Sequence, residues 1–337
     1  LEWEVDMKPS FVDYKLARQQ AKKILPRLVF DFIDGGAGEE NGLIRNENAF
    51  LESQLLPLVL RDPDQAQIET VFLKKNYGRP FGCAPMGLCN LAGPKTDQNL
   101  AKAAAQYKFP VCISTASSTP LETYIEQAEG YAWFQLYITG DMTFTDTLID
   151  RAEASGYENL ILTVDVPRLA RRPRDTKNGF QTPFKMTARH FLDFATHPIW
   201  SLRTLKSGAP KMANYESAKS GGYDRNAPRR GANWHYLEQL RDRWKKNLIV
   251  KGVMSTDDAI RIKSIGADAL YISNHGGRQL DSAPSTLNAL KAIRTAIGSD
   301  YPLLLDGGVR QAEDLAKAMA LGANFTMMGR PFLFAAA

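Results

Sequence analysis

Strand-like and helix-like segments alternate along this chain from about residue 80 to its last residues. Amphipathic runs of helical length separate most of the short apolar runs, among them residues 97–107, 141–156, 256–265, 285–297 and 312–321. Strands that alternate with helices indicate a parallel sheet, because each helix returns the chain to the same edge. Eight such strands favour a closed (β/α)8 TIM barrel, which takes roughly 250 residues, over an open doubly wound sheet. The predicted strands span 80–84, 109–113, 132–137, 159–165, 247–251, 268–273, 301–306 and 324–328.

Most of the predicted strands end in a residue that can bind a ligand or take part in chemistry. In a (β/α)8 barrel the carboxyl ends of all strands meet at one face, where the active site lies. The sequence therefore predicts one polar site at that face of a single domain, residues 1–337. The strand-end residues are Pro85 and Gly87, Ser114, Gln135 and Tyr137, Thr163 and Asp165, Lys251, His275, Asp306, and Gly329 with Arg330.

Two segments lie outside the alternation. Residues 10–36 have the pattern of helices that precede the barrel, and they end at Gly35-Gly36, a typical helix stop. Residues 166–234 are too long for an ordinary connection and indicate a functional insertion. Within it, residues 181–234 hold nine basic and three acidic residues. Because the whole chain has a net charge of only +5, the remainder is close to neutral.

Composition narrows the class of protein. Hydrophobic residues make up 44% and charged residues 23%, as in globular domains. No apolar run reaches the roughly 18 residues that a membrane span needs, and the first residues lack a signal-peptide layout. Cys83, Cys89 and Cys112 are odd in number, so we expect no disulfide framework and a reducing, cytoplasmic compartment. No metal site is predicted.

A dense polar motif, Ser-Asn-His-Gly-Gly-Arg-Gln-Leu-Asp, occupies residues 273–281 directly after an apolar run. His275 can take a proton near neutral pH, and Arg278 can hold a carboxylate by two parallel hydrogen bonds. The motif therefore predicts proton abstraction next to a bound carboxylate. The alternative is a polar turn with a capping histidine, the default for an isolated histidine. The chain has only four histidines, and this one lies in a polar cluster, which favours the catalytic interpretation.

Glycine-rich turns follow the last two predicted strands. Asp306-Gly307-Gly308-Val309-Arg310 ends the seventh strand and Gly329-Arg330 ends the eighth. Barrels often bind phosphate at this place through exposed backbone N–H groups. Two tight turns would explain the glycines but not the arginines, so the pattern favours a phosphate site.

Lys251 ends the fifth predicted strand after three apolar residues. A buried lysine needs an anionic partner. It could stabilise negative charge on a reduced cofactor, form a structural ion pair, or act as a Schiff-base lysine. The neighbouring phosphate site favours the first of these roles.

These motifs resemble those of the FMN-dependent 2-hydroxy acid oxidising family, which includes glycolate oxidase, lactate oxidase, L-lactate dehydrogenase and (S)-mandelate dehydrogenase. The resemblance runs from about Phe11 to the last residue. It implies an FMN flavoprotein that oxidises an (S)-2-hydroxy acid, and a homotetramer. Besides residues 273–281, the matching motifs are Phe134-Gln135-Leu136-Tyr137, Leu162-Thr163-Val164-Asp165, Val250-Lys251-Gly252, Asp306-Gly307-Gly308-Val309-Arg310 and Gly329-Arg330-Pro331.

The resemblance also implies residue roles. His275 would be the base and Asp165 the carboxylate that orients it. Arg278 and Arg172 would hold the substrate carboxylate, and Tyr137 would hydrogen-bond the substrate. The implied FMN contacts are Ala84, Pro85, Met86, Gly87, Ser114, Gln135, Thr163, Lys251, Asp306, Gly307, Gly308, Arg310, Gly329 and Arg330.

The chain departs from the family pattern in four places. Phe32 stands where the family commonly has a second substrate-binding tyrosine, so one carboxylate hydrogen bond should be missing. Ala116 replaces a bulky tryptophan of glycolate oxidase-like members, which leaves room for a larger substrate. Gly87, where several oxidases have alanine, points towards a dehydrogenase. The chain ends at residues 332–337, directly after the eighth strand, so we expect the closing helix of the family to be absent.

The insertion mixes basic residues with apolar ones between residues 185 and 211. A basic segment that carries aromatic residues can lie on an anionic membrane surface. A lid helix packed over the active site explains the pattern equally well. Nucleic-acid binding is not expected, because no recognised motif accompanies the charge.

We therefore predict an FMN-dependent dehydrogenase of a lactate- or mandelate-like acid that passes electrons to a quinone or another acceptor. An oxidase that uses O₂ is the alternative within the family. A phosphate-binding isomerase or aldolase, and a non-catalytic membrane-binding barrel, are the alternatives from other classes. Hydride and carbanion routes would use the same residues.

Overall fold

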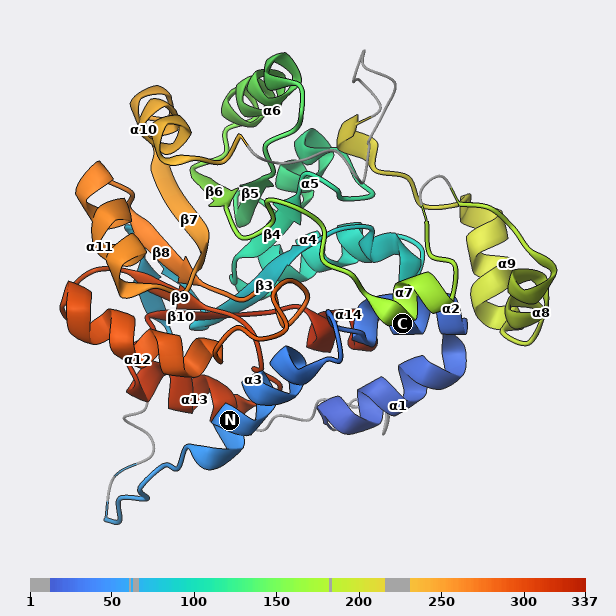
Figure 1. Ribbon diagram of the computed structural model, residues 1–337, viewed down its shortest axis with the longest axis horizontal. Helices are drawn as coiled ribbons and strands as arrows, with labels where there is room; N and C mark the ends of the chain where they lie inside the picture. The colour runs from blue at the N-terminus through green and yellow to red at the C-terminus, as the bar shows by residue number, and fades with distance from the viewer. Residues whose placement is uncertain (1–12, 61, 63–66, 182–183, 216–230) are drawn as a thin grey trace.

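The computed structural model describes residues 13–60, 62, 67–181, 184–215 and 231–337. Its eight parallel strands form a closed barrel in chain order, and β10 pairs with both β9 and β3 (Figure 1). The predicted TIM barrel is confirmed. The strands are β3 (Phe81–Met86), β4 (Val111–Ser114), β5 (Ala132–Leu136), β6 (Asn159–Thr163), β7 (Asn247–Val253), β8 (Ala269–Ile272), β9 (Leu303–Leu305) and β10 (Phe325–Met328).

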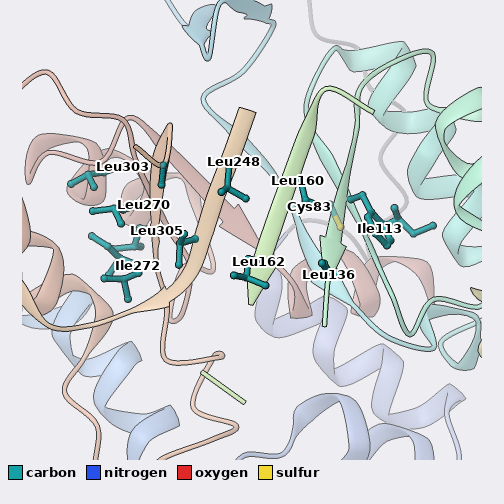
Figure 2. Packing of buried hydrophobic residues seen from close by; sticks show 14 of the residues in the cluster. Cys83, Ile113, Leu136, Leu160, Leu162, Leu248, Leu270, Ile272, Leu303 and Leu305 are labelled. Carbon is teal, nitrogen blue, oxygen red and sulfur yellow. The ribbon is translucent and has the colours of Figure 1, made fainter. Parts of the chain in front are cut away.

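Alternate residues of the barrel strands enter two apolar clusters, because successive side chains of a strand point to opposite faces. One cluster lies between strands and helices, and Figure 2 shows Leu160, Leu162 and Leu248 within it. The other fills the barrel interior and includes Ile161 and Ile249. Burial on both faces explains why the strands read as continuous apolar runs.

A short antiparallel hairpin, β1 (Thr70–Phe72) and β2 (Lys75–Tyr77), adds to the interior cluster. Phe72 and Tyr77 pack against Trp133, and the Trp133 indole donates a 3.2 Å hydrogen bond to the Tyr77 hydroxyl. The sequence did not indicate this hairpin, because each strand is only three residues long.

Helices follow the barrel strands and cover the outside of the barrel (Figure 1). The predicted helices at 97–107, 141–156, 256–265, 285–297 and 312–321 are confirmed to within a few residues. Asp141, Ser255 and Ser285 each cap a helix by accepting a backbone N–H bond, which explains where those helices begin. The outer helices are α4 (Thr96–Tyr107), α5 (Leu121–Gln127), α6 (Met142–Ala154), α10 (Trp234–Arg243), α11 (Thr256–Ile265), α12 (Thr286–Ile297), α13 (Ala312–Ala320) and α14 (Arg330–Ala336).

A short helix that the sequence analysis did not anticipate follows the eighth strand. Residues Arg330–Ala336 form α14, with a proline in its first turn. Phe334 packs against Phe30 and Tyr14 with ring centroids 5.8 Å apart in both pairs. These contacts bury much of α14, so its sequence lacks the polar stripe by which a surface helix is recognised.

Three helices precede the barrel: α1 (Tyr14–Ile24), α2 (Arg27–Asp34) and α3 (Asn41–Glu52). The first two confirm the helices expected within 10–36, apart from residues 10–12, which lie outside the described residues. The described part of the insertion contains α7 (Pro173–Lys177), α8 (Ala188–Ala195), α9 (Pro198–Ser207) and the short 3-10 helix η4 (Ala213–Tyr215). A second 3-10 helix, η3 (Cys89–Leu91), follows β3. In the part of the chain that the structure describes, no helix has the length and apolar content required to cross a membrane.

Candidate active site

One cavity opens at the carboxyl ends of the barrel strands, and it gathers most of the predicted site residues. Side chains from α2, β7, the β8–α12 connection and the insertion all reach it. Asp165, Gln135, Thr163 and Gly308 do not line the cavity. The predicted residues that do are Phe32, Ala84, Pro85, Met86, Gly87, Ser114, Tyr137, Arg172, Lys251, His275, Arg278, Asp306, Gly307, Arg310, Gly329 and Arg330.

His275 lies between two polar partners. Its Nδ1 is 3.0 Å from Oδ1 of Asp165, and its Nε2 is 3.2 Å from the hydroxyl oxygen of Tyr137. His275 itself has a φ of +60°, and its backbone N–H donates to the Ser273 hydroxyl at 3.0 Å. The carboxylate therefore holds one side of the imidazole and leaves Nε2 directed towards Tyr137 and the cavity.

Gly252 permits this arrangement, although the sequence analysis assigned it no role. Its φ is +108°, and a Cβ atom there would lie 2.5 Å from Cβ of Asp165. Any side chain would displace the carboxylate that contacts His275. A glycine directly after a strand-end lysine is the signal that could have identified it.

The two charges of the Asp165–His275 pair influence each other. Burial lowers the pKa of His275, and the positive charges of Lys251 and Arg172 lower it further. The Asp165 carboxylate raises this pKa but does not outweigh burial, so the pKa of His275 lies below its ordinary value of 6.5. Burial raises the pKa of Asp165, but the positive charges of His275 and Lys251 outweigh it, so the carboxyl pKa is lowered. A neutral imidazole beside a carboxylate anion is the state expected of a general base.

The two predicted carboxylate-binding arginines lie together. Nε of Arg172 donates to the backbone oxygen of Arg278 at 3.3 Å, and Arg278 donates to the Gly35 carbonyl at 2.5 Å. Within the arginine-rich run, Arg168 and Arg171 are exposed, whereas Arg172 lines the cavity. Arg172 is thus the arginine of this run that reaches the cavity.

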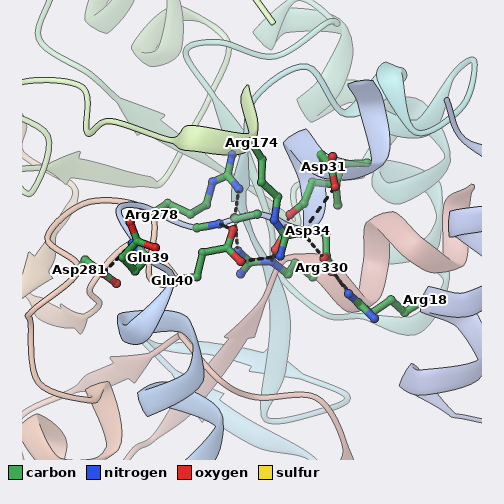
Figure 3. Close-up of polar contacts among 12 residues, drawn as sticks. Arg18, Asp31, Asp34, Glu39, Glu40, Arg174, Arg278, Asp281 and Arg330 are labelled. Atoms are coloured by element: carbon green, nitrogen blue, oxygen red, sulfur yellow. Dashed lines mark hydrogen bonds and ion pairs between the residues drawn. The ribbon is translucent and has the colours of Figure 1, made fainter. Parts of the chain in front are cut away.

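A charged network behind these arginines was not anticipated (Figure 3). Asp34, at the end of α2, accepts hydrogen bonds from Arg18 at 2.6 Å and from Arg174 at 2.8 Å. Burial raises the pKa of Asp34, but these hydrogen bonds and the charges of Arg18 and Arg330 outweigh it, so the carboxyl pKa is lowered. The network joins α2 to α7, the helix that directly follows Arg172.

Arg330 contributes to the same region in an unexpected way. Its guanidinium donates to the backbone oxygens of Ile33, Gly35 and Gly276 at 2.9–3.1 Å. These carbonyls include those at the carboxyl end of α2, where cations are stabilising. Arg330 therefore fixes the chain around Arg278, in addition to lining the cavity.

Lys251 has the anionic partner that its burial requires. Its ammonium lies 3.4 Å from Asp306 and donates a 2.8 Å hydrogen bond to the Ser273 hydroxyl, which in turn donates to Asp306 at 2.6 Å. Burial lowers the pKa of Lys251, but Asp306 and Asp165 outweigh it, so the pKa is raised. The ion pair leaves Lys251 charged at the cavity wall.

Two buried polar atoms next to cavity-lining residues lack hydrogen-bond partners within the described part of the chain: Gln135 bonds to Ser114, and Thr163 lies opposite Lys251 in the sheet. Ser114 donates to Oε1 of Gln135 at 2.8 Å, while Nε2 of Gln135 and Oγ1 of Thr163 are buried with no hydrogen-bond partner among the described residues. Buried polar groups are nearly always paired, so a ligand with hydrogen-bonding ring edges fits here. A flavin has such edges, and Lys251 supplies a cation on the adjacent strand.

The two glycines of the turn after β9 have different roles. Gly307 has a φ of +88° and lines the cavity, as a phosphate-binding glycine would. Gly308 instead permits close packing, because a Cβ atom there would lie 2.6 Å from the Asn46 carbonyl oxygen. Arg310 reaches the cavity while its guanidinium pairs with Glu47 at 2.9 Å.

Comparison with known proteins decides the family. A model of the FMN-dependent dehydrogenase family matches residues 21–337. The chain belongs to this family. FMN is accordingly the cofactor of this FMN-dependent dehydrogenase, in agreement with the buried donors described above.

Two named dehydrogenases are similar in sequence to this chain over nearly its whole length. (S)-mandelate dehydrogenase of Pseudomonas putida is 36% identical over 96% of this chain and 82% of the relative. L-lactate dehydrogenase of Pseudomonas syringae pv. syringae (strain B728a) is 35% identical over 97% of this chain and 87% of the relative.

Solved structures agree with this assignment. The monotopic membrane protein (S)-mandelate dehydrogenase superposes on the FMN-dependent dehydrogenase described here with a TM-score of 0.92 and 35% identity, covering 98% of this chain and 89% of its own. Mandelate oxidase gives a TM-score of 0.82 and 32% identity, covering 97% and 88%.

Proposed function

We propose that this protein oxidises an (S)-2-hydroxy acid, lactate- or mandelate-like, to the 2-oxo acid. The names of both curated relatives support this substrate class. The observation that carries the proposal is the Asp165–His275–Tyr137 array, whose His275 and Tyr137 share one cavity with Arg172 and Arg278. When bound, FMN accepts the two electrons that leave the substrate.

The residues divide the work by chemistry. Arg172 and Arg278 hold the substrate carboxylate, so that the hydroxyl-bearing carbon faces His275. Nε2 of His275 takes a proton, either from the hydroxyl in a hydride route or from the carbon in a carbanion route. Asp165 stabilises the imidazolium that forms, and Tyr137 donates a hydrogen bond to the substrate oxygen.

Residues on other strands hold the cofactor. Gln135 and Thr163 offer their unpaired polar atoms to the flavin ring, with Ser114 and the backbone of residues 84–87 beside them. Lys251 favours negative charge on the reduced ring. Gly307, Arg310 and the Gly329-Arg330 turn would hold the phosphate. Asp306 would bind the ribityl chain, and Gly308 supports the turn.

A panel of 2-hydroxy acids with an artificial electron acceptor tests the proposal. We expect turnover of at least one acid and bleaching of the flavin absorbance under anaerobic conditions. Absence of turnover with every acid, in protein that holds FMN, would contradict it. The Schiff-base alternative is disfavoured, because Lys251 is paired with Asp306 and has a raised pKa, whereas a nucleophilic amine must be neutral.

For the electron acceptor we propose a quinone dissolved in a membrane on which the protein rests. No described residue of α8 or α9 lines the cavity, which disfavours the lid interpretation. Their outer surface is instead apolar and edged by basic residues, as in helices that lie on anionic membranes. The exposed apolar residues are Phe191, Leu192, Ile199, Leu202 and Leu205, and the nearby basic residues are Lys185, Arg189, Arg203, Lys206 and Lys211.

Sedimentation with anionic vesicles tests this surface. The double variant Ile199→Asp, Leu202→Asp should lose binding, because it places two charges in the apolar surface. Ile260→Asp, a change of a half-exposed residue on α11, should retain it. Equal binding of all three proteins would contradict the surface, and turnover with O₂ as fast as with a quinone would favour an oxidase.

We further propose one domain, residues 1–337, with 166–234 as its insertion, working on the cytoplasmic face of the membrane as a homotetramer. All three cysteines are free and buried, which agrees with a reducing compartment. Residues 55–60 carry several strongly exposed apolar side chains, which an assembly could bury. Light scattering of the purified protein tests the tetramer.

A further inference from the structure

Phe180, a residue of the insertion, forms part of the cavity wall. Its ring stacks on that of Phe32, with centroids 4.2 Å apart and planes 11° apart. Leu169 and Met212 add apolar surface to the same cavity, from either side of Phe180 in the chain. The insertion therefore supplies three apolar side chains to the cavity, beside the guanidinium of Arg172.

The backbone around Phe180 is held firmly. Gly179 has a φ of +69°. The side-chain amide of the preceding residue, Asn178, donates a 2.6 Å hydrogen bond to the Asp31 carboxylate. The carbonyl of Asn178 lies 2.8 Å from Nε2 of His190, and a Cβ atom on Gly179 would lie 3.2 Å from the same nitrogen. The Phe180 N–H closes the turn on Asp175 at 2.8 Å. These contacts fix the point from which the ring enters the cavity.

Phe32 connects this apolar wall to the carboxylate-binding end. The guanidinium carbon of Arg278 lies 5.3 Å from the centre of the Phe32 ring, within cation–π range. A substrate held by Arg278 would therefore lie beside the aromatic pair, which is within reach of its remaining substituent. On another side of the cavity, Ala116 and Gly87 are small and adjacent: a Cβ atom on Gly87 would lie 3.1 Å from that of Ala116.

We propose that Phe180 is a specificity-determining residue that selects 2-hydroxy acids with a large apolar, aryl substituent over those with a methyl group. The proposal rests on the proposed function. An aryl group buries more apolar surface against Phe180 than a methyl group does, and aromatic pairs gain beyond area alone. Discrimination by one apolar pocket reaches roughly 10–200-fold per methylene-sized change.

The test compares kcat/KM for (S)-mandelate and (S)-lactate. The unaltered protein should prefer (S)-mandelate, and Phe180→Ala should lower the mandelate-to-lactate ratio by roughly ten-fold or more. Phe180→Leu should restore part of the ratio, and Tyr107→Ala, a change of an exposed aromatic residue on α4, should leave it unaltered. A ratio unaltered by Phe180→Ala, or a preference of the unaltered protein for lactate, would overturn the proposal.

Binding of the two 2-oxo acid products, followed by the flavin absorbance, measures the preference for an aryl over a methyl substituent without turnover. It decides the proposal even if Phe180→Ala fails to fold, because Phe180→Leu then carries the comparison. If neither acid is turned over but the binding ratio still responds to position 180, the proposed oxidation fails and the aryl-selecting role of Phe180 stands.

Discussion

The hydroxyl oxygen of Tyr137 lies 3.2 Å from Nε2 of His275, while Nδ1 of the same ring lies 3.0 Å from Asp165. The two partners occupy the two ring nitrogens, so Nδ1–H is directed to the carboxylate and Nε2 remains able to accept a proton. A substrate hydroxyl that enters between Tyr137 and His275 would meet a base and a donor together.

Replacement of the base should separate cofactor binding from catalysis. We expect His275→Ala to keep bound FMN but to slow flavin reduction by substrate about 10²–10⁴-fold, the usual contribution of a general base. Stopped-flow absorbance under anaerobic conditions measures it. Tyr137→Phe, which removes only a hydroxyl, should cost less. Reduction by His275→Ala at nearly the unaltered rate would exclude the base role.

The rate should depend on pH through His275. Its pKa is lowered below 6.5, so the neutral, proton-accepting form is already present at neutral pH. We expect the rate to rise with pH through this lowered pKa and then to level off, at a lower pH than an exposed histidine would give. Asp165→Asn removes the charge that raises the His275 pKa, so the acid limb should move to lower pH while the maximal rate falls. A limb that moves upward would contradict this coupling.

FMN retention should depend on Arg310. Arg310→Ala would remove the charge-assisted hydrogen bond proposed to hold the phosphate, a loss of about 1.5–3 kcal/mol, or roughly ten-fold or more in affinity. The flavin-to-protein ratio after dialysis measures it. Glu47→Gln removes only the carboxylate partner of Arg310 and should retain FMN. Full occupancy in Arg310→Ala would place the phosphate elsewhere.

A hydroxyl at position 32 should strengthen acid binding. Phe32 lines the cavity next to Arg278, so Phe32→Tyr can add a hydrogen bond to the substrate carboxylate. Such a bond contributes about 1.5–3 kcal/mol, or roughly ten-fold in binding. KM should fall for free acids but not for their esters. Tighter binding of both classes would indicate general packing, and no effect on either would show that the hydroxyl does not reach the carboxylate.

The barrel itself was predictable, because its elements are encoded locally. Residues Leu160–Leu162 of β6, for example, are apolar at every position, since both faces of a barrel strand are buried. The residues that end the strands then share one face by topology alone. For this reason His275, Asp165 and Tyr137 could be placed together before any coordinates were known.

Contacts between distant parts of the chain were not predictable in the same way. Nothing near Arg330 in the sequence indicates that its guanidinium binds the carbonyls at the end of α2. The stacking of Phe180 on Phe32 also joins segments whose spacing carries no periodic signal. The helix α14 was missed because its burial removes the amphipathic pattern.

The sequence by itself determined the order of strands and helices, the polar face of the barrel and the identity of the groups that meet there, since hydrophobic periodicity and strand-end chemistry are local properties. The tertiary structure decided the rest: that Lys251 pairs with Asp306, that Arg172 rather than Arg171 faces the cavity, and that the insertion contributes an aromatic wall. These outcomes depend on distances and burial, which arise only when segments far apart in the chain pack together.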